Sequence, residues 1–214
     1  MSLAVAVSGE SQFTAGHGSA SIMAKPLIIG TSISADLTTG SPGKRLALRY
    51  TKDRNIKIKA ESGQSGFRTL SEIRERDYAG RSVVIGLDLF FWDSLLPNIR
   101  PSLKALSQLL KKTEELDLPL ILGDIPELIP GFQPGREALN REIHRICAAS
   151  SHCKLIPLDR MYQNISKDGQ LCIKGKAYTL QELIPDGLHV SSVAGDYLAD
   201  VLLGVLEPHS KLAS

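Results

Sequence analysis

The sequence predicts an α/β fold, a three-layer α/β/α sandwich in which helices cover both faces of a five-stranded parallel sheet. Short apolar runs rich in Val, Ile and Leu alternate along the chain with amphipathic helical patterns. Such alternation is typical of parallel strands joined by crossover helices. The 214 residues suit a single domain, and 43% hydrophobic with 22% charged residues is ordinary for a soluble globular protein.

Five segments are predicted as strands. Residues 26–29 form a short apolar run, and residues 55–60 alternate between apolar and polar side chains. Three further runs have the composition of buried central strands. These runs are residues 82–87, 119–122 and 154–158.

The first crossover is predicted as a helix that begins at Ser41. Ser41 and Pro42 suit the N-cap and the first helical position, and Leu46 and Tyr50 then fall on one face. Another strand is the alternative for residues 46–50. We prefer the helix because parallel strands need a crossover connection.

Further helices follow from capping and periodicity. Thr69 and Glu72 have the spacing of a capping box ahead of Ile73. Residues 171–180 are predicted to form a small hairpin that turns at 174–176. Apolar stripes mark three more helices, which contain Leu103, Leu106, Leu109, Leu110 and Leu116; Leu139, Ile143, Ile146 and Cys147; and Val193, Tyr197, Val201 and Val205.

The bulk composition excludes several classes of partner. The chain has 25 Lys and Arg against 23 Asp and Glu, so its net charge gives no strong electrostatic attraction for nucleic acid. No apolar run is long enough to span a membrane. Residues 1–24 are rich in Ser, Ala and Gly and are predicted to be a flexible arm ahead of one domain, 25–214. No basic residue precedes the short apolar run 3–7, so no signal peptide is recognised and the cytoplasm is the expected compartment. The oligomeric state is not predicted.

The cysteines are expected to be reduced. Three of them, Cys147, Cys153 and Cys172, make an odd and widely spaced set, which argues against a disulfide framework. His144 and His152 lie close to the first two and raise the alternative of a metal site, but the spacing fits no zinc pattern. Buried thiols at a helix end are the preferred interpretation.

Two polar segments are candidates for chemistry. Ser32 follows the first strand, at the sheet edge where ligands bind in parallel folds, although Ser and Gly there usually make only a turn. Asp186 and His189 are three residues apart ahead of the last helix, so the carboxylate can orient the imidazole. The alternative for this pair is a capped helix start with a surface histidine.

Together these segments resemble the GDSL or SGNH hydrolases. The stretch Gly30-Thr31-Ser32-Ile33-Ser34 stands where the family has Gly-Asp-Ser-Leu-Ser, and Asp186-Gly187-Leu188-His189 matches its Asp-x-x-His block. Gly63-Gln64-Ser65-Gly66 is similar to the block that follows the second strand, and Gly86-Leu87-Asp88-Leu89 falls where the family has Gly-x-Asn-Asp. The resemblance covers residues 25 to 206 and implies a flavodoxin-like five-stranded sheet.

The resemblance implies a catalytic triad of Ser32, Asp186 and His189 in a serine esterase or lipase that hydrolyses a small-molecule ester without metal or organic cofactor. The amides of Ser32 and Gly66 are the implied oxyanion hole. Thr31 replaces the family's Asp. Asp88 replaces the family's Asn, whose side chain would donate to the oxyanion, and an ionised carboxylate cannot donate.

Three alternatives are open for Asp88. Its carboxyl group is protonated in a dry site, its side chain turns toward a basic residue, or no residue here fills the donor role of the family's Asn. If the donor is missing, Asp88→Asn is expected to give a faster enzyme. If Asp88 instead pairs with a basic residue, or another group supplies the donor, the same change is expected to break a structural contact and to lower both stability and rate. The substrate is a small acyl ester, a lipid or an acetylated sugar. Phe90, Phe91 and Trp92 either line its pocket or close the core, and residues 124–135 are expected to flank the site. A weakly catalytic binding module and an acyltransferase are the alternative functions.

Overall fold

A five-stranded parallel sheet forms the centre of the molecule. The computed structural model describes residues 18–36 and 39–206. The strands lie in the order β2-β1-β3-β4-β5, and every pairing is parallel. This order confirms the predicted flavodoxin-like sheet. The strands are β1 (Pro26–Gly30), β2 (Lys57–Ala60), β3 (Val83–Gly86), β4 (Leu120–Gly123) and β5 (Cys153–Ile156).

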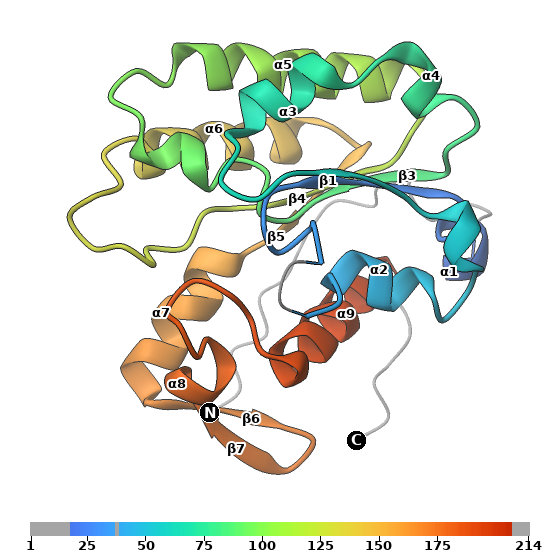
Figure 1. Cartoon of the computed structure of the whole chain (residues 1–214). Helices are drawn as coiled ribbons and strands as arrows, with labels where there is room; N and C mark the ends of the chain where they lie inside the picture. The colour runs from blue at the N-terminus through green and yellow to red at the C-terminus, as the bar shows by residue number, and fades with distance from the viewer. Residues whose placement is uncertain (1–17, 37–38, 207–214) are drawn as a thin grey trace.

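Helices cover both faces of this sheet, as Figure 1 shows. Leu120 and Leu122 of β4 pack into one apolar core, while Ile121 between them packs into the other. Both faces of the sheet are therefore buried, which confirms the three-layer sandwich. One face carries α3 (Gly66–Glu72), α5 (Arg100–Glu115) and α6 (Arg136–Ala149), and the other carries α2 (Pro42–Ala47) and α9 (Ser192–Leu206).

The described part of the predicted N-terminal arm is packed against the domain. The short helix α1 (Ser19–Ile22) precedes β1, and the side chains of Ile22 and Met23 are buried in the core beneath α2 and α9. Burying these two apolar side chains stabilises the segment against the sheet. Residues 1–17 of the predicted arm lie outside the described residues.

Two predicted helix starts have different outcomes. The Ser41 hydroxyl accepts a hydrogen bond from the amide of Lys44 at 3.2 Å, which confirms the predicted N-cap, although α2 ends at Ala47, before Tyr50. The capping box at Thr69 and Glu72 is wrong, because Thr69 lies inside α3. The next helix, α4 (Glu75–Tyr78), begins instead where Asp77 accepts from the amide of Arg74 at 2.8 Å.

The chain after β5 differs most from the prediction. The strand ends at Ile156, and residue 158, predicted as its last residue, begins the helix α7 (Leu158–Asp168). The predicted hairpin follows as β6 (Gln170–Ile173) and β7 (Lys176–Thr179), whose turn residues Lys174 and Gly175 both have positive φ. The short helix α8 (Leu180–Leu183) completes this segment, which we call the α7–α8 module, and which lies beside α9 outside the sandwich (Figure 1).

Two short 3₁₀ helices, Asp53–Asn55 and Trp92–Leu95, precede β2 and α5. Within the described ranges, the chain has no helix with the length and apolar character that a membrane crossing requires.

Gly66 lies at a close approach between α3 and the loop after β3. A β-carbon at Gly66 would overlap the backbone carbonyl oxygen of Leu89. We therefore expect Gly66→Ala to lower the free energy of unfolding by about 1–3 kcal/mol in urea denaturation. Gly204→Ala is the matched control, because apart from its own helix no described atom lies within 4 Å of a β-carbon at that position, and alanine favours the helix by up to about 1 kcal/mol. Equal effects at the two glycines would contradict the prediction.

Candidate active site

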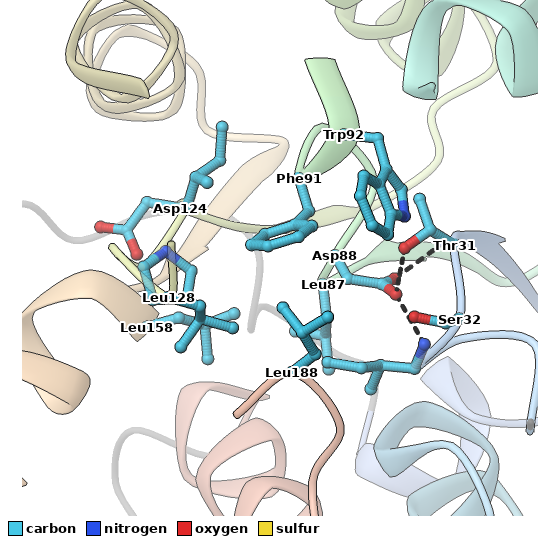
Figure 2. Close-up of a pocket in the computed structure, with 13 residues that line it drawn as sticks. Thr31, Ser32, Leu87, Asp88, Phe91, Trp92, Asp124, Leu128, Leu158 and Leu188 are labelled. Carbon is cyan, nitrogen blue, oxygen red and sulfur yellow. Dashed lines mark hydrogen bonds between the residues drawn. The ribbon is translucent and has the colours of Figure 1, made fainter. Parts of the chain in front are cut away.

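Ser32 and Asp88 lie next to each other at the carboxyl edge of the sheet. Ser32 follows β1 and Asp88 follows β3. These two strands are neighbours, because β2 pairs with one edge of β1 and β3 pairs with the other, so the order of the strands reverses at β1. Parallel sheets bind their ligands at the carboxyl ends of the strands where this order reverses. Both residues line one pocket (Figure 2), and Ser32 is only 7% exposed.

The Asp88 carboxylate holds the loop that carries Ser32. Its Oδ1 accepts from the Thr31 amide at 3.2 Å and from the Ser34 hydroxyl at 2.5 Å. Its Oδ2 accepts from the Thr31 hydroxyl and the Ile33 amide, both at 2.8 Å, and from the Ser34 amide at 3.3 Å. Five donors of one short loop therefore converge on the two oxygen atoms of a single buried carboxyl group.

Of the three alternatives considered from the sequence, this arrangement agrees with an unfilled donor role. Among the described residues, the carboxyl group of Asp88 contacts backbone amides and hydroxyl groups of the loop that carries Ser32 and makes no ion pair with a basic side chain. Thr31, which replaces the family's Asp, supplies two of the donors. As placed, Asp88 accepts hydrogen bonds and positions Ser32, and it offers no donor to an oxyanion.

The amide of Ser32 differs from those of its neighbours. The amides of Thr31, Ile33 and Ser34 donate to Asp88, and that of Ala35 donates to the Thr31 carbonyl at 2.8 Å. Among the described residues, the Ser32 amide donates no hydrogen bond. This N–H is available to an oxygen atom of a ligand.

The amide of Gly66 is engaged elsewhere. It donates to Oδ2 of Asp93, while the Phe67 amide and the Ser102 hydroxyl donate to Oδ1 at 3.3 and 2.5 Å. Asp93 is fully buried, and this burial raises the pKa of its carboxyl group. The part of Gly66 in an oxyanion hole stays a prediction. Asp93, which holds the start of α3, was missed because nothing in its local sequence distinguishes it from a surface acid.

Asp186 and His189 are in contact within one turn, as the sequence predicted. Oδ2 of Asp186 lies 2.6 Å from Nδ1 of His189, and Oδ1 accepts from the amides of Leu188 and His189 at 2.9 and 2.7 Å. Gly187 makes this turn with a φ of 78°. The His189 amide above all, then the imidazole and the Leu188 amide, hold the pKa of Asp186 well below its usual range. A carboxylate at Nδ1 leaves Nε2 to accept a proton.

The pair lies beside the pocket of Ser32. Leu188, which precedes His189, lines that pocket opposite Phe91 and Trp92 (Figure 2). In the described part of the chain, no hydrogen bond joins the Ser32 hydroxyl to the imidazole. Such bonds in free enzymes are often long and tighten when substrate binds. The link between Ser32 and His189 stays a prediction.

The rest of the pocket comes partly from predicted segments. Phe91 and Trp92 line it, whereas Phe90 is buried in the core. The predicted flank contributes Asp124, Ile125, Pro126 and Leu128. Leu87 and Leu158 were not predicted. The pocket is therefore apolar except at Ser32, its neighbour Thr31 and two carboxylates.

The lowered pKa of Asp186 predicts how the stability of the fold depends on pH. A carboxyl group whose pKa is lower in the folded than in the unfolded protein stabilises the fold above its unfolded pKa, and this contribution is lost as the pH falls toward the lowered value. We therefore expect the free energy of unfolding to fall less steeply between about pH 5 and pH 2 in Asp186→Asn than in the wild type. Equal slopes of the two proteins in urea denaturation across this range would contradict the prediction.

Solved structures of esterases and lipases share this fold. The esterase EstA from Pseudoalteromonas sp. is 18% identical over 86% of this chain and 97% of its own, with a TM-score of 0.60. A G-D-S-L family lipolytic protein from Veillonella parvula is 13% identical over 85% and 97%, with a TM-score of 0.64. The acetylxylan esterase Axe2 from Geobacillus stearothermophilus is 17% identical over 86% and 94%, also with a TM-score of 0.64.

The chain has the GDSL hydrolase fold. This confirms the resemblance inferred from the sequence at the level of the fold. By sequence, no family model and no curated protein matches the chain. The GDSL fold accounts for the common location of Ser32, Asp88 and the Asp186–His189 turn at one edge of the sheet.

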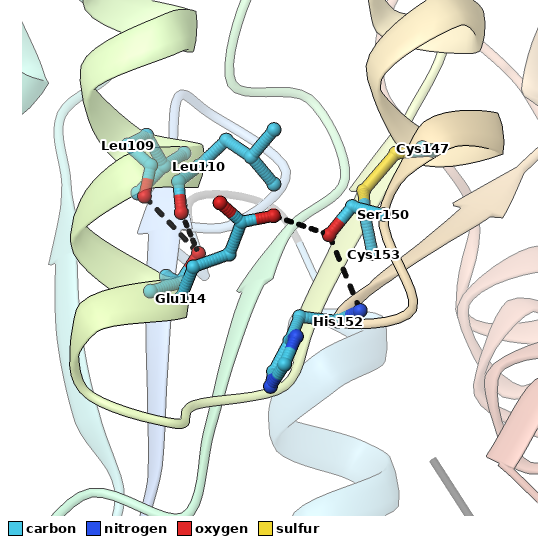
Figure 3. The surroundings of a disulfide bond; sticks show 8 residues. Leu109, Leu110, Glu114, Cys147, Ser150, His152 and Cys153 are labelled. Atoms are coloured by element: carbon cyan, nitrogen blue, oxygen red, sulfur yellow. Dashed lines mark hydrogen bonds between the residues drawn. A yellow bond between two sulfur atoms is a disulfide. The ribbon is translucent and has the colours of Figure 1, made fainter. Parts of the chain in front are cut away.

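The expectation of free thiols at the end of α6 is wrong. Cys147 and Cys153 form a disulfide with Cα atoms 4.6 Å apart, shown in Figure 3. The two cysteines are six residues apart, Cys147 near the end of α6 and Cys153 at the start of β5. The chain turns back between them, which brings their Cα atoms within the range that a disulfide spans. Cys172 in β6 is free and exposed.

The histidines near this disulfide have separate partners. Nε2 of His144 lies 2.8 Å from Asp124, and Nε2 of His152 lies 2.9 Å from Asp117. Across residues 18–36 and 39–206, no group of three or more His, Cys, Asp or Glu side chains is arranged to hold a metal ion.

Proposed function

We propose that the protein is a serine ester hydrolase that acts through an acyl-enzyme on a small acyl ester, a lipid or an acetylated sugar. The Ser32 hydroxyl attacks the ester carbonyl carbon while His189 accepts its proton. The carbon–oxygen bond to the alcohol then breaks, and His189 returns the proton to the departing oxygen. Water repeats the sequence at the acyl group, and Asp186 orients His189 throughout.

The unpaired amide of Ser32 is the observation that carries this proposal. Asp88 engages the amides of Thr31, Ile33 and Ser34 and leaves the amide between them free to donate. An oxyanion formed at the carbon that Ser32 attacks lies close to this N–H, where a fixed donor stabilises developing charge. The Asp186–His189 pair beside the same pocket, and esterases that share the fold, support it further.

A binding module with weak turnover is the second candidate. It is favoured by the engaged amide of Gly66, because this contact and the acceptor role of Asp88 leave the site with fewer donors than the family pattern implies. Loss of one such donor typically slows hydrolysis about 10²–10³-fold.

A fluorophosphonate probe tests whether Ser32 is an activated nucleophile. We expect labelling of the wild type at Ser32, turnover of p-nitrophenyl acetate, and loss of both in Ser32→Ala. Ser65→Ala is the matched control, because the Ser65 side chain makes no capping hydrogen bond. An adduct on Ser34 or Ser65 would contradict the assignment, and labelling without turnover would favour the binding module.

A further inference from the structure

The site has fewer oxyanion donors than the family pattern implies. The carboxyl group of Asp88 accepts hydrogen bonds from the loop that carries Ser32, and the amide of Gly66 donates to Asp93. Of the two amides implied for the oxyanion hole, that of Ser32 alone stays available. Because removal of one donor typically slows such reactions about 10²–10³-fold, a second donor in the same pocket has a large effect on the rate.

The indole nitrogen of Trp92 is a second N–H group at this pocket. Trp92 begins the 3₁₀ helix after β3 and lines the pocket of Ser32. Its Nε1 atom is buried and has no hydrogen-bond partner among the described residues. Of the buried side-chain nitrogen and oxygen atoms that lack a partner in the described ranges, it is the only one whose residue lines this pocket. Buried indole N–H groups usually have an acceptor, so this one is a candidate to bind a ligand.

The ring of Trp92 is held with its nitrogen on the side of the pocket that carries the nucleophile. It packs edge-on against Phe91, with the ring centroids 5.3 Å apart and the ring planes at 82°. Figure 2 shows the nitrogen-bearing edge of the indole turned toward Thr31 and Asp88, on the same side of the pocket as Ser32. Asp88 already accepts five hydrogen bonds from the loop that carries Ser32, and none of them comes from the indole. The indole N–H therefore lies beside the nucleophile without an acceptor.

We infer that the indole N–H of Trp92 is a donor of the oxyanion hole and, with the amide of Ser32, fills the role that Asp88 leaves open. This inference rests on the proposed ester hydrolysis and adds a catalytic residue to it. As Oγ of Ser32 bonds to the ester carbon, the electron pair of the carbonyl double bond moves onto the oxygen, which then accepts from both N–H groups. The pair returns when the bond to the alcohol breaks, and the indole keeps its proton throughout.

The burial of this N–H suits a donor to developing charge. A phenyl ring packs in the same place without an unpaired donor, whose burial costs free energy in the resting protein. A donor that is shielded from water interacts more strongly with a charged acceptor than an exposed donor does. Catalytic hydrogen bonds often form fully only when substrate occupies the site, so a small rotation of the ring on binding completes the contact.

The indole N–H can be observed directly. Trp92 is the only tryptophan in the chain, so one indole signal in a ¹H–¹⁵N spectrum reports on it. A fluorophosphonate joins its phosphorus to Oγ of Ser32, releases fluoride, and leaves a phosphoryl oxygen where the oxyanion forms. We expect this adduct to move the indole proton downfield and to slow its exchange with water, and the same probe to leave the signal of Ser32→Ala unchanged. An adduct on Ser32 that leaves the indole signal where it was would overturn the inference.

Trp92→Phe removes the N–H and keeps an aromatic ring at the position. We expect kcat for p-nitrophenyl acetate to fall about 10²–10³-fold while KM changes less than about threefold, because the donor acts on the transition state. Leu96→Ala is the matched control. Leu96 and Trp92 line a second hollow next to the pocket of Ser32, but Leu96 does not line the pocket itself, so its kcat is expected to stay within about threefold of the wild type. An unchanged kcat in Trp92→Phe, or equal losses in the two variants, would contradict the donor role.

A replacement of nearly constant volume separates the lost donor from lost packing. Benzothienylalanine in place of Trp92 has a sulfur atom where the indole has its N–H, and volume-conserving changes disturb packing least. We expect the same loss of kcat as in Trp92→Phe. Wild-type turnover by this protein would show that the N–H has no part in the reaction.

The two proposals fail in different ways. If the probe labels Ser32 and acetate esters are hydrolysed, but the indole signal and the kcat of Trp92→Phe are unchanged, ester hydrolysis stands and the donor role of Trp92 is wrong. If Ser32 is not labelled and no ester is hydrolysed, the proposed function is wrong and the inference about Trp92 falls with it.

Discussion

His189→Ala is expected to lower kcat/KM for ester hydrolysis by about 10⁴-fold or more. Without a base, the Ser32 hydroxyl is a poor nucleophile at neutral pH, and the departing alkoxide has no proton donor. The geometry supports this role because Asp186 occupies Nδ1 at 2.6 Å and leaves Nε2 for the proton transfer. Steady-state kinetics with p-nitrophenyl esters measure the loss.

Two further variants separate loss of the base from loss of structure. Asp186→Asn is expected to cut the rate heavily by permitting the wrong imidazole tautomer; the serine-protease triad is the known example. His152→Ala is the control, because His152 pairs with Asp117 on the side of the molecule that carries the disulfide. If His189→Ala and Asp186→Asn both kept wild-type rates, the triad would be wrong. The base would then be sought at His144, His152, or His17 and His209 outside the described residues.

The sequence was sufficient where a local pattern determines structure. Apolar runs located β1, β3, β4 and β5, whereas the alternation of apolar and polar residues located the half-buried strand β2 at one edge of the sheet. The helix α7 also had a signal that was overlooked. Leu158, Met161, Tyr162 and Ile165 have the spacing of one helical face, but the apolar start of the helix was assigned to the preceding strand.

The sequence was insufficient where contacts join distant segments. Asp88 lies more than fifty residues from the loop that it holds, and Asp93 binds the start of α3 from the loop after β3. The apolar hollow beside the pocket of Ser32 combines residues from the loop after β1, α7, β6 and α9. Neither hydrogen-bond partners nor a shared hollow can be read from periodicity, because both depend on how the layers pack.

Asp88→Asn is expected to be slower than the wild type and less stable, which is the second of the two outcomes considered from the sequence. The carboxylate presents two acceptor oxygens to five donors. An asparagine has one acceptor oxygen. If that oxygen replaces Oδ2, its NH₂ group faces the donating amide of Thr31, and only the Ser34 hydroxyl can turn to accept. An unpaired buried donor costs about 1–3 kcal/mol, and the loop that positions Ser32 loosens.

We therefore expect the free energy of unfolding of Asp88→Asn to fall by about 1–3 kcal/mol and its kcat/KM to fall by about 10²-fold, since a small misplacement of a nucleophile has effects of this size. Urea denaturation and ester kinetics across pH measure both. Asp196→Asn is the matched control: Asp196 is exposed and its ion pair with Arg45 is worth less than about 1 kcal/mol. A faster Asp88→Asn enzyme at neutral pH would show that the carboxylate impedes the oxyanion more than it supports the loop. A slower enzyme of unchanged stability would place its effect in the reaction alone.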